Sequence, residues 1–79
     1  MKNSVYVLHS KKGDYFYVGR ATDINGRLNE HNNGKCKHTS EFRPWEIVAS
    51  ITLKDEKKAL EFEKYLKTGS GLAFQKRHF

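Results

Sequence analysis

Two strand-like segments that lie close together in the chain set the first limit on the fold. Ser4–His9 (SVYVLH) and Asp14–Gly19 (DYFYVG) are rich in β-branched and aromatic residues, which favour strands. Only the short segment Ser10–Gly13 separates them. A connection this short joins antiparallel neighbours, because parallel strands need a crossover of about a dozen residues or more. The sequence therefore predicts a β-hairpin at the start of the chain.

The expected pairing of this hairpin places two phenols beside each other. If His9 pairs with Asp14 across the turn, Tyr6 lies opposite Tyr17. Opposite residues of an antiparallel pair project from the same face of the sheet. The side chain of a tyrosine in a strand is ordinarily half-buried, with its hydroxyl in contact with water. The pair therefore indicates a functional site only together with other groups.

The rest of the chain alternates between helix and strand patterns. The expected elements are a helix capped by Thr22 or Asp23 that ends near Asn32, a basic irregular connection over Lys35–Arg43, a strand over Trp45–Leu53, a helix over Glu56–Lys67 capped by Asp55, and a short final helix from Ser70. One small sheet with helices against it is the economical packing for this order. We therefore expect an α+β fold, a three-stranded antiparallel sheet flanked by helices in the order β-β-α-β-α-α.

Length and cysteine content narrow the class of protein. The sequence has 79 residues, which suit a single domain over residues 1–79 with a modest core. One cysteine, Cys36, excludes an intrachain disulfide and a Cys-rich zinc site, and fits a cytoplasmic protein. No apolar run approaches the roughly 20 residues that span a bilayer, and the N-terminus lacks a signal-peptide pattern. No membrane partner is expected.

The balance of charge points to a polyanionic partner. Fifteen Lys and Arg residues against nine Asp and Glu residues give a formal net charge of +6 at pH 7. On a small surface this excess attracts nucleic acid through long-range electrostatics and counterion release. A merely soluble basic protein is the plainer interpretation of the same charge.

Three side chains suit phosphate chemistry. Arg27 and His31 are four apart in the first helix and therefore share a face. Arginine is always charged and donates hydrogen bonds in a planar fork that matches phosphate. Glu63 lies on the shoulder of the apolar stripe of the second helix, where a carboxylate can hold one hard cation with water completing the shell. Taken singly, each is an ordinary surface residue, and the simple interpretation of Glu63 is an ion pair with Lys67, four residues later in the helix.

The order and spacing of these residues resemble the GIY-YIG nuclease family. Ser4-Val5-Tyr6 and Tyr17-Val18-Gly19 match its two tyrosine motifs, and Arg27, His31 and Glu63 follow in the same order. The stretches RLNEHNNGK, TSEFRPWEIV and ALEFEKYLKTGSGLAF are similar to small standalone bacterial and phage members. The resemblance covers nearly the whole chain, and the five-residue set is far more specific than any short motif.

The resemblance implies a metal-dependent endonuclease that hydrolyses phosphodiester bonds in DNA. Tyr6 and Tyr17 correspond to the motif tyrosines, Arg27 to the phosphate-binding arginine, His31 to a helix position often occupied by His or Tyr, and Glu63 to the ligand of one Mg²⁺ or Mn²⁺ ion. The resemblance points to Tyr17 as general base. An unperturbed imidazole, with a pKa near 6.5, would be the easier base at neutral pH, so His31 stays an alternative.

Four positions depart from the family pattern without removing a member of this set. Ser4 replaces the first motif glycine, at a position that requires a small side chain rather than a positive φ. Arg20 and Ala21 stand where small hydroxyl residues are frequent, which alters contacts at the phosphate. Gly26 lies inside the first helix, where glycine costs about 1 kcal/mol relative to alanine.

Target selection would depend on the basic surface, on a homodimer or on a protein partner. The expected phosphate-backbone contacts are Lys35, Lys37, His38 and Arg43 in the connection, together with Lys11, Lys12 and Lys67. DNA is the expected substrate, with branched or damaged structures as candidates and RNA as an alternative. Two other functions stay open, a nucleic-acid-binding module with little or no cleavage and a protein-interaction domain with a basic face.

Overall fold

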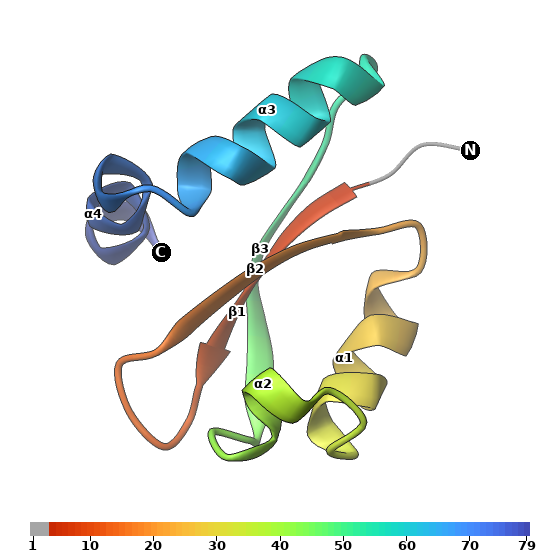
Figure 1. Cartoon of the computed structure of the whole chain (residues 1–79), viewed down its shortest axis with the longest axis vertical. Coiled ribbons are helices and arrows are strands. Elements are labelled where there is room, and N and C mark those ends of the chain that lie inside the picture. The colour runs from red at the N-terminus through yellow and green to blue at the C-terminus, as the bar shows by residue number, and fades with distance from the viewer. Residues whose placement is uncertain (1–3) are drawn as a thin grey trace.

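The chain forms a three-stranded sheet with two helices on each side (Figure 1). The computed structural model describes residues 4–79. The elements are β1 (Ser4–Ser10), β2 (Phe16–Ala21), α1 (Ile24–Asn32), α2 (Lys37–Ser40), β3 (Trp45–Thr52), α3 (Glu56–Leu66) and α4 (Gly69–His78). The predicted α+β fold with an antiparallel sheet is confirmed, and α2 is one more helix than expected.

The first strand is the centre of the sheet. The strands are ordered β2-β1-β3, and β1 pairs antiparallel with both neighbours. The whole of β1 except His9 is buried, in keeping with this central position. β2 is an edge strand, so one side of its backbone is free of ladder partners.

The predicted register of the hairpin is wrong by two residues. Tyr6 lies opposite Gly19, and Leu8 lies opposite Tyr17. The reason is that β1 extends to Ser10, whose N–H donates to the carbonyl of Tyr15 at 2.9 Å, so the turn begins one residue later in the chain than expected, at Lys11 instead of Ser10. Because the slip is an even number of residues, Tyr6 and Tyr17 still project from the same face.

Each face of the sheet carries its own apolar cluster. On the side of α3 and α4 the buried members are Val5, Val7, Val18, Ala59 and Leu66. On the side of α1 and α2 they are Tyr6, Leu8 and Trp45, with Tyr17, Ile24, Leu28 and Phe42 packed around them. The second cluster is rich in aromatic side chains, and it is the one that carries the candidate site.

The helix ends follow the predicted capping residues. Asp23 accepts a hydrogen bond from the N–H of Gly26 at the start of α1, and Asp55 accepts from two N–H groups at the start of α3. Gly34, just beyond α1, has a φ of 77°, a conformation that favours glycine. Both helices therefore begin where the sequence predicts.

Two segments are more helical than predicted. The connection expected to be irregular contains α2, a single helical turn. The final helix extends over Gly69–His78 instead of being the short helix expected from Ser70. A Cβ at Gly71 would collide with the backbone of Tyr65 and Leu66, so glycine lets α4 cross α3 closely. None of the helices in residues 4–79 is long and apolar enough to cross a membrane.

Candidate active site

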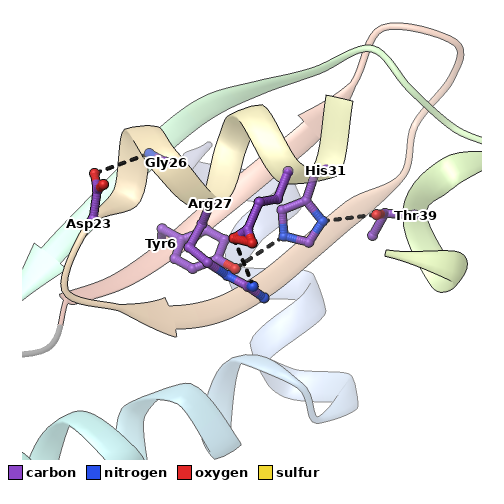
Figure 2. A network of polar contacts seen from close by, with 7 residues as sticks. Tyr6, Asp23, Gly26, Arg27, His31 and Thr39 are labelled. Carbon is purple, nitrogen blue, oxygen red and sulfur yellow. Dashed lines mark hydrogen bonds and ion pairs between the residues drawn. The ribbon is translucent and has the colours of Figure 1, made fainter. Parts of the chain in front are cut away.

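Four of the five predicted catalytic side chains meet on the face of the sheet that α1 covers. Tyr6 and Tyr17 project from β1 and β2, with ring centroids 6.3 Å apart. The imidazole of His31 lies 4.7 Å from the Tyr17 ring and 6.1 Å from the Tyr6 ring, centroid to centroid. Arg27, one turn before His31 on α1, reaches the same place (Figure 2). We call Tyr6, Tyr17, Arg27 and His31 the α1-face group.

The glycine of the second motif makes room for the first tyrosine. Gly19 is the strand partner of Tyr6, and a Cβ on Gly19 would collide with the phenol ring and hydroxyl of Tyr6. The backbone of Gly19 shows no positive φ. Glycine is therefore needed here for close approach of a side chain, and the motif has a packing cause.

A chain of hydrogen bonds fixes the orientation of His31 (Figure 2). Its Nε2 lies 3.2 Å from the Tyr6 hydroxyl, and its Nδ1 lies 2.8 Å from the hydroxyl of Thr39 on α2. Thr39 donates its hydrogen to the carbonyl of Cys36 at 3.3 Å, so its oxygen accepts from His31 Nδ1. Nε2 of the neutral ring is then the acceptor, and Tyr6 donates to it.

The surroundings keep this pair neutral. Burial lowers the pKa of the His31 imidazole, and the positive charge of Arg27 lowers it further, while Glu30 acts in the opposite direction. Burial raises the pKa of the Tyr6 phenol, and Arg27 opposes this effect in part. Both side chains are almost fully buried, at 0% exposure for His31 and 1% for Tyr6. Neither can touch bulk water in this arrangement.

Arg27 is the cationic member of the α1-face group and is partly exposed. Its Nη1 lies 3.1 Å from the carboxylate of Glu30, one turn later on α1. Contact with the Tyr6 hydroxyl raises the pKa of Arg27 and secures its charge. Arg27 and Arg20 line one open cleft beside the start of α1, together with the acidic residues Asp23 and Glu30.

Glu63 lies on α3 and is held by two cations. Its Oε1 is 3.6 Å from Arg20 Nε, and its Oε2 is 3.0 Å from Lys67 Nζ. Within residues 4–79, no hydrogen bond or ion pair joins Glu63 directly to the α1-face group. The connection runs through the edge strand, because Arg20 of β2 contacts Glu63 and shares a cleft with Arg27.

Comparison with known proteins agrees with this arrangement. A family model described as the GIY-YIG catalytic domain matches residues 2–76. The chain belongs to the GIY-YIG family. The resemblance carried by the tyrosine motifs is thereby confirmed for most of the chain.

Relatives of this GIY-YIG domain are small bacterial proteins. A UPF0213 protein of Staphylococcus epidermidis is 40% identical over 68 residues, which are 85% of this chain and 82% of the relative. A UPF0213 protein of Halalkalibacterium halodurans is 33% identical over 64 residues, 80% of this chain and 67% of the relative. The solution NMR structure of a UPF0213 protein from Bacillus halodurans superposes with a TM-score of 0.58 at 28% identity, covering 95% of this chain and 82% of that one.

The donor set suits a metal that takes few ligands from the protein. In the described part of the chain, no three His, Cys, Asp or Glu side chains gather as a metal cluster. Mg²⁺ nevertheless binds commonly through one or two carboxylates, with water and substrate phosphate as the other ligands. The mostly buried carboxylate of Glu63, 15% exposed, fits that role for one Mg²⁺ or Mn²⁺ ion.

Most of the predicted nucleic-acid contacts gather at one end of the GIY-YIG domain. Lys12 Nζ donates to the carbonyl of Glu41 at 3.3 Å, and the N–H of Lys11 donates to the carbonyl of Pro44. The hairpin turn therefore lies beside the segment after α2. The exposed basic residues of the hairpin turn and of the connection around α2, which we call the basic end, are Lys11, Lys12, Lys35, Lys37, His38 and Arg43. Lys67 lies apart from them, beside Glu63.

Two residues of the site were not predicted as members of it. Thr39 orients His31, and no pattern in the sequence indicates that a residue in a basic connection will do so. Arg20 binds Glu63, whereas the sequence marks Arg20 only as a departure from the family pattern. Its position one residue after the YVG motif was the available signal, because the end of an edge strand is accessible to a neighbouring helix.

Proposed function

We propose that this protein is a metal-dependent endonuclease that hydrolyses phosphodiester bonds in DNA, acting in the cytoplasm. The observation that supports it most is the α1-face group, in which a partly exposed phenol and guanidinium stand over a buried Tyr6–His31 pair. The match to a GIY-YIG catalytic domain supports the same function. The names of the relatives state no activity, so the proposal rests on the site and the family.

Arg27 would bind the phosphate at the reaction centre. Its charge is secured, its side chain is partly exposed, and it lines the cleft that Arg20 also lines. Two arginines at one cleft suit an anion with several oxygens, because a guanidinium group donates a planar fork of hydrogen bonds. Stabilising the charge that develops on the phosphate is commonly the largest single contribution to such a reaction.

As the phenolate, Tyr17 would accept a proton from the attacking water. Tyr17 is partly exposed, whereas Tyr6 and His31 are excluded from solvent. A general base must come within hydrogen-bond reach of the proton that it takes. We therefore assign Tyr17 the role of base, and give Tyr6 and His31 the role of positioning the group around it.

Glu63 would hold the divalent ion, which when bound neutralises charge on the phosphate and the leaving oxygen. The ion must share the carboxylate with Arg20 and Lys67 or displace them. Both cations lie at the sheet edge, where a bound phosphate would be an alternative partner for them. Substrate binding would then release the carboxylate as it brings in the phosphate oxygens.

A second function is a nucleic-acid-binding module that cleaves slowly or not at all. The observation that favours it is the state of Glu63, whose carboxylate already has two cationic partners. If these pairs persist with DNA bound, no ligand for the ion is free. The basic end would still attract nucleic acid through counterion release.

A nicking assay separates the two functions. Purified protein is incubated with supercoiled and branched DNA in Mg²⁺, Mn²⁺ or EDTA. An endonuclease nicks in the presence of metal, and Glu63→Gln lowers the rate about 100-fold or more. The matched control is Glu61→Gln, an exposed carboxylate on the same helix, which should nick like the wild type. Salt-sensitive binding without nicking in any metal would favour the module, and no binding at all would favour a protein-interaction domain.

A further inference from the structure

A second cavity adjoins the proposed active site. It has a volume of about 350 Å³ and lies between the edge strand β2 and the junction of α3 with α4. Two of its lining residues, Tyr17 and Lys67, belong to the site already described or contact it. The side chain of Tyr17 projects from the opposite face of the sheet, so the link to the site is Lys67, which joins this cavity to the proposed metal ligand Glu63.

The walls of the cavity are mostly apolar. Phe16 and Val18 of β2 form one side, and Leu66 of α3 and Leu72 of α4 form the other. Leu72 is 42% exposed, so part of its side chain is open to a ligand. The volume of the cavity lies at the lower end of the range for ligand pockets, ~300–1,000 Å³. A flat apolar group such as a nucleobase suits it.

Backbone groups of the edge strand supply polarity along one side. The N–H of Ser10 donates to the carbonyl of Tyr15, and hydrogen-bonded pairs alternate with non-bonded pairs along an antiparallel ladder. The peptide groups of Phe16 and Val18 therefore face away from β1. Since β2 has no second neighbour in the described sheet, these donors and acceptors are available to a ligand.

A buried amide oxygen adds a second polar feature. Gln75 also lines the cavity, and its Nε2 donates to the carbonyls of Leu66 and Gly71 at 2.6 and 3.3 Å. These two carbonyl acceptors fix the orientation of the Gln75 amide, because its oxygen has no hydrogen to donate to them. Oε1 then remains a buried acceptor that has no hydrogen-bond partner among residues 4–79.

We infer that this cavity receives an unpaired base of the nucleic-acid strand that is cut, with the adjoining phosphate at Lys67. The inference rests on the proposed function and names its substrate class. A base in a duplex is stacked on both faces and paired along its edge, so it cannot enter. An unpaired base offers a flat apolar surface to the walls and polar edges to the strand backbone. The positive net charge and Lys67 favour a nucleic acid over a neutral ligand.

Binding without cleavage tests this inference. In EDTA, the affinity for a fluorescein-labelled strand of about eight deoxyadenosines is compared by anisotropy with that for an abasic strand carrying the same number of phosphates. We expect the wild type to bind the base-carrying strand about tenfold more tightly. Equal affinity for both strands would overturn the inference, because charge alone would then explain binding.

Two variants locate the effect in the cavity. Gly69 lines the cavity, and a Cβ built on it meets no atom within 4 Å, so Gly69→Leu adds a bulky side chain at the cavity wall from a position that tolerates a Cβ. It should abolish the preference for bases, whereas Ser70→Leu, the next residue on the same helix and outside the cavity lining, should keep it. If Gly69→Leu proves unfolded, Leu72→Ala is used and should reduce the preference. A full preference in a folded Gly69→Leu or Leu72→Ala variant counts against the cavity.

Failure of this inference can be told apart from failure of the proposed function. A wild-type protein that prefers bases but never nicks DNA would keep the cavity assignment and refute the nuclease. A protein that nicks DNA but binds both strands equally would keep the nuclease and refute the cavity. The binding measurement uses EDTA, so its outcome does not depend on the metal.

Discussion

The Nε2 atom of His31 lies 3.2 Å from the Tyr6 hydroxyl, and both side chains are closed to solvent. This pair joins the first strand of the sheet to the helix that carries Arg27. The exposed part of the α1-face group is thus built on a buried polar support. The stability of this buried pair determines how well Arg27 and Tyr17 are positioned.

Loss of the Thr39 hydroxyl should destabilise this support. Thr39→Val keeps the shape of the side chain but leaves Nδ1 of His31 buried without an acceptor. An unpaired buried donor costs about 1–3 kcal/mol, and we expect the free energy of unfolding to fall by that amount. The measurement is urea unfolding followed by circular dichroism. Thr39→Ser retains the hydroxyl and should lose clearly less stability. Equal losses of stability in the two variants would show that the hydrogen bond contributes little.

Acid should destabilise the protein through His31. Its pKa is lowered in the folded state by burial and by Arg27, whereas the unfolded chain has the ordinary value of about 6.5. The unfolded state therefore binds a proton first as pH falls. This contribution to stability is complete above pH ~7 and is lost below pH ~6.5, by up to about 1.4 kcal/mol per pH unit.

Two histidine variants isolate that effect. Unfolding free energies are compared between about pH 7.5 and 5.5, above the range in which most carboxylates titrate. His31→Gln should be less stable at neutral pH but should show a smaller loss in acid. His38→Gln changes an exposed histidine and should keep the wild-type pH dependence. An unchanged dependence in His31→Gln would place its origin elsewhere.

A methyl group at Gly19 should disturb the site through Tyr6. The added Cβ of Gly19→Ala would collide with the Tyr6 phenol, which is held between the sheet and α1. Overpacking of this kind typically costs about 1–3 kcal/mol. Gly69→Ala is the matched control, since its Cβ meets nothing within 4 Å and it should be neutral or slightly stabilising. Thermal unfolding of the two variants decides between steric crowding and a general effect of losing glycine.

The sequence predicted the fold class and most elements, and the errors have local causes. Strand and helix patterns with their capping residues were sufficient for β1, β3, α1 and α3. The hairpin register was wrong because Ser10 accepts a hydrogen bond from the Lys12 N–H and extends the strand pair, a choice made by turn chemistry. The turn α2 forms where a basic segment has no helical periodicity, and Thr39 and His31 bring it against α1.

For the candidate site, the sequence predicted the grouping of four side chains but not the surroundings of the fifth. The grouping of Tyr6, Tyr17, Arg27 and His31 follows from strand parity and helix spacing, which are local rules. The surroundings of Glu63 depend on how α3 crosses the edge of β2, a relation between distant segments that spacing alone does not contain. For this reason the pair of Arg20 with Glu63 was absent from the prediction.

Removal of one cation from Glu63 should make metal binding easier. Arg20→Met takes away a positive charge 3.6 Å from the carboxylate, so a divalent ion meets less competition and less repulsion. We expect Mn²⁺ to broaden the NMR signals around Glu63 at a concentration lower by about threefold or more. Arg77→Met removes an exposed arginine at the far end of α4 and should leave the titration unchanged. Broadening that is centred elsewhere would contradict the assignment of Glu63.

The basic end should determine the salt dependence of DNA binding. Lys37→Gln removes one exposed charge from this end without touching a buried group. If Lys37 neutralises one phosphate, the slope of log affinity against log salt becomes shallower by about 0.9 on duplex DNA, through one fewer counterion released. Lys57→Gln, on α3 and away from the basic end, has the same charge change and should alter the slope little. Equal slopes for the two variants would mean that DNA responds to net charge alone, and a shallower slope only for Lys37→Gln would place the phosphate backbone at the end of the molecule formed by the hairpin turn and α2.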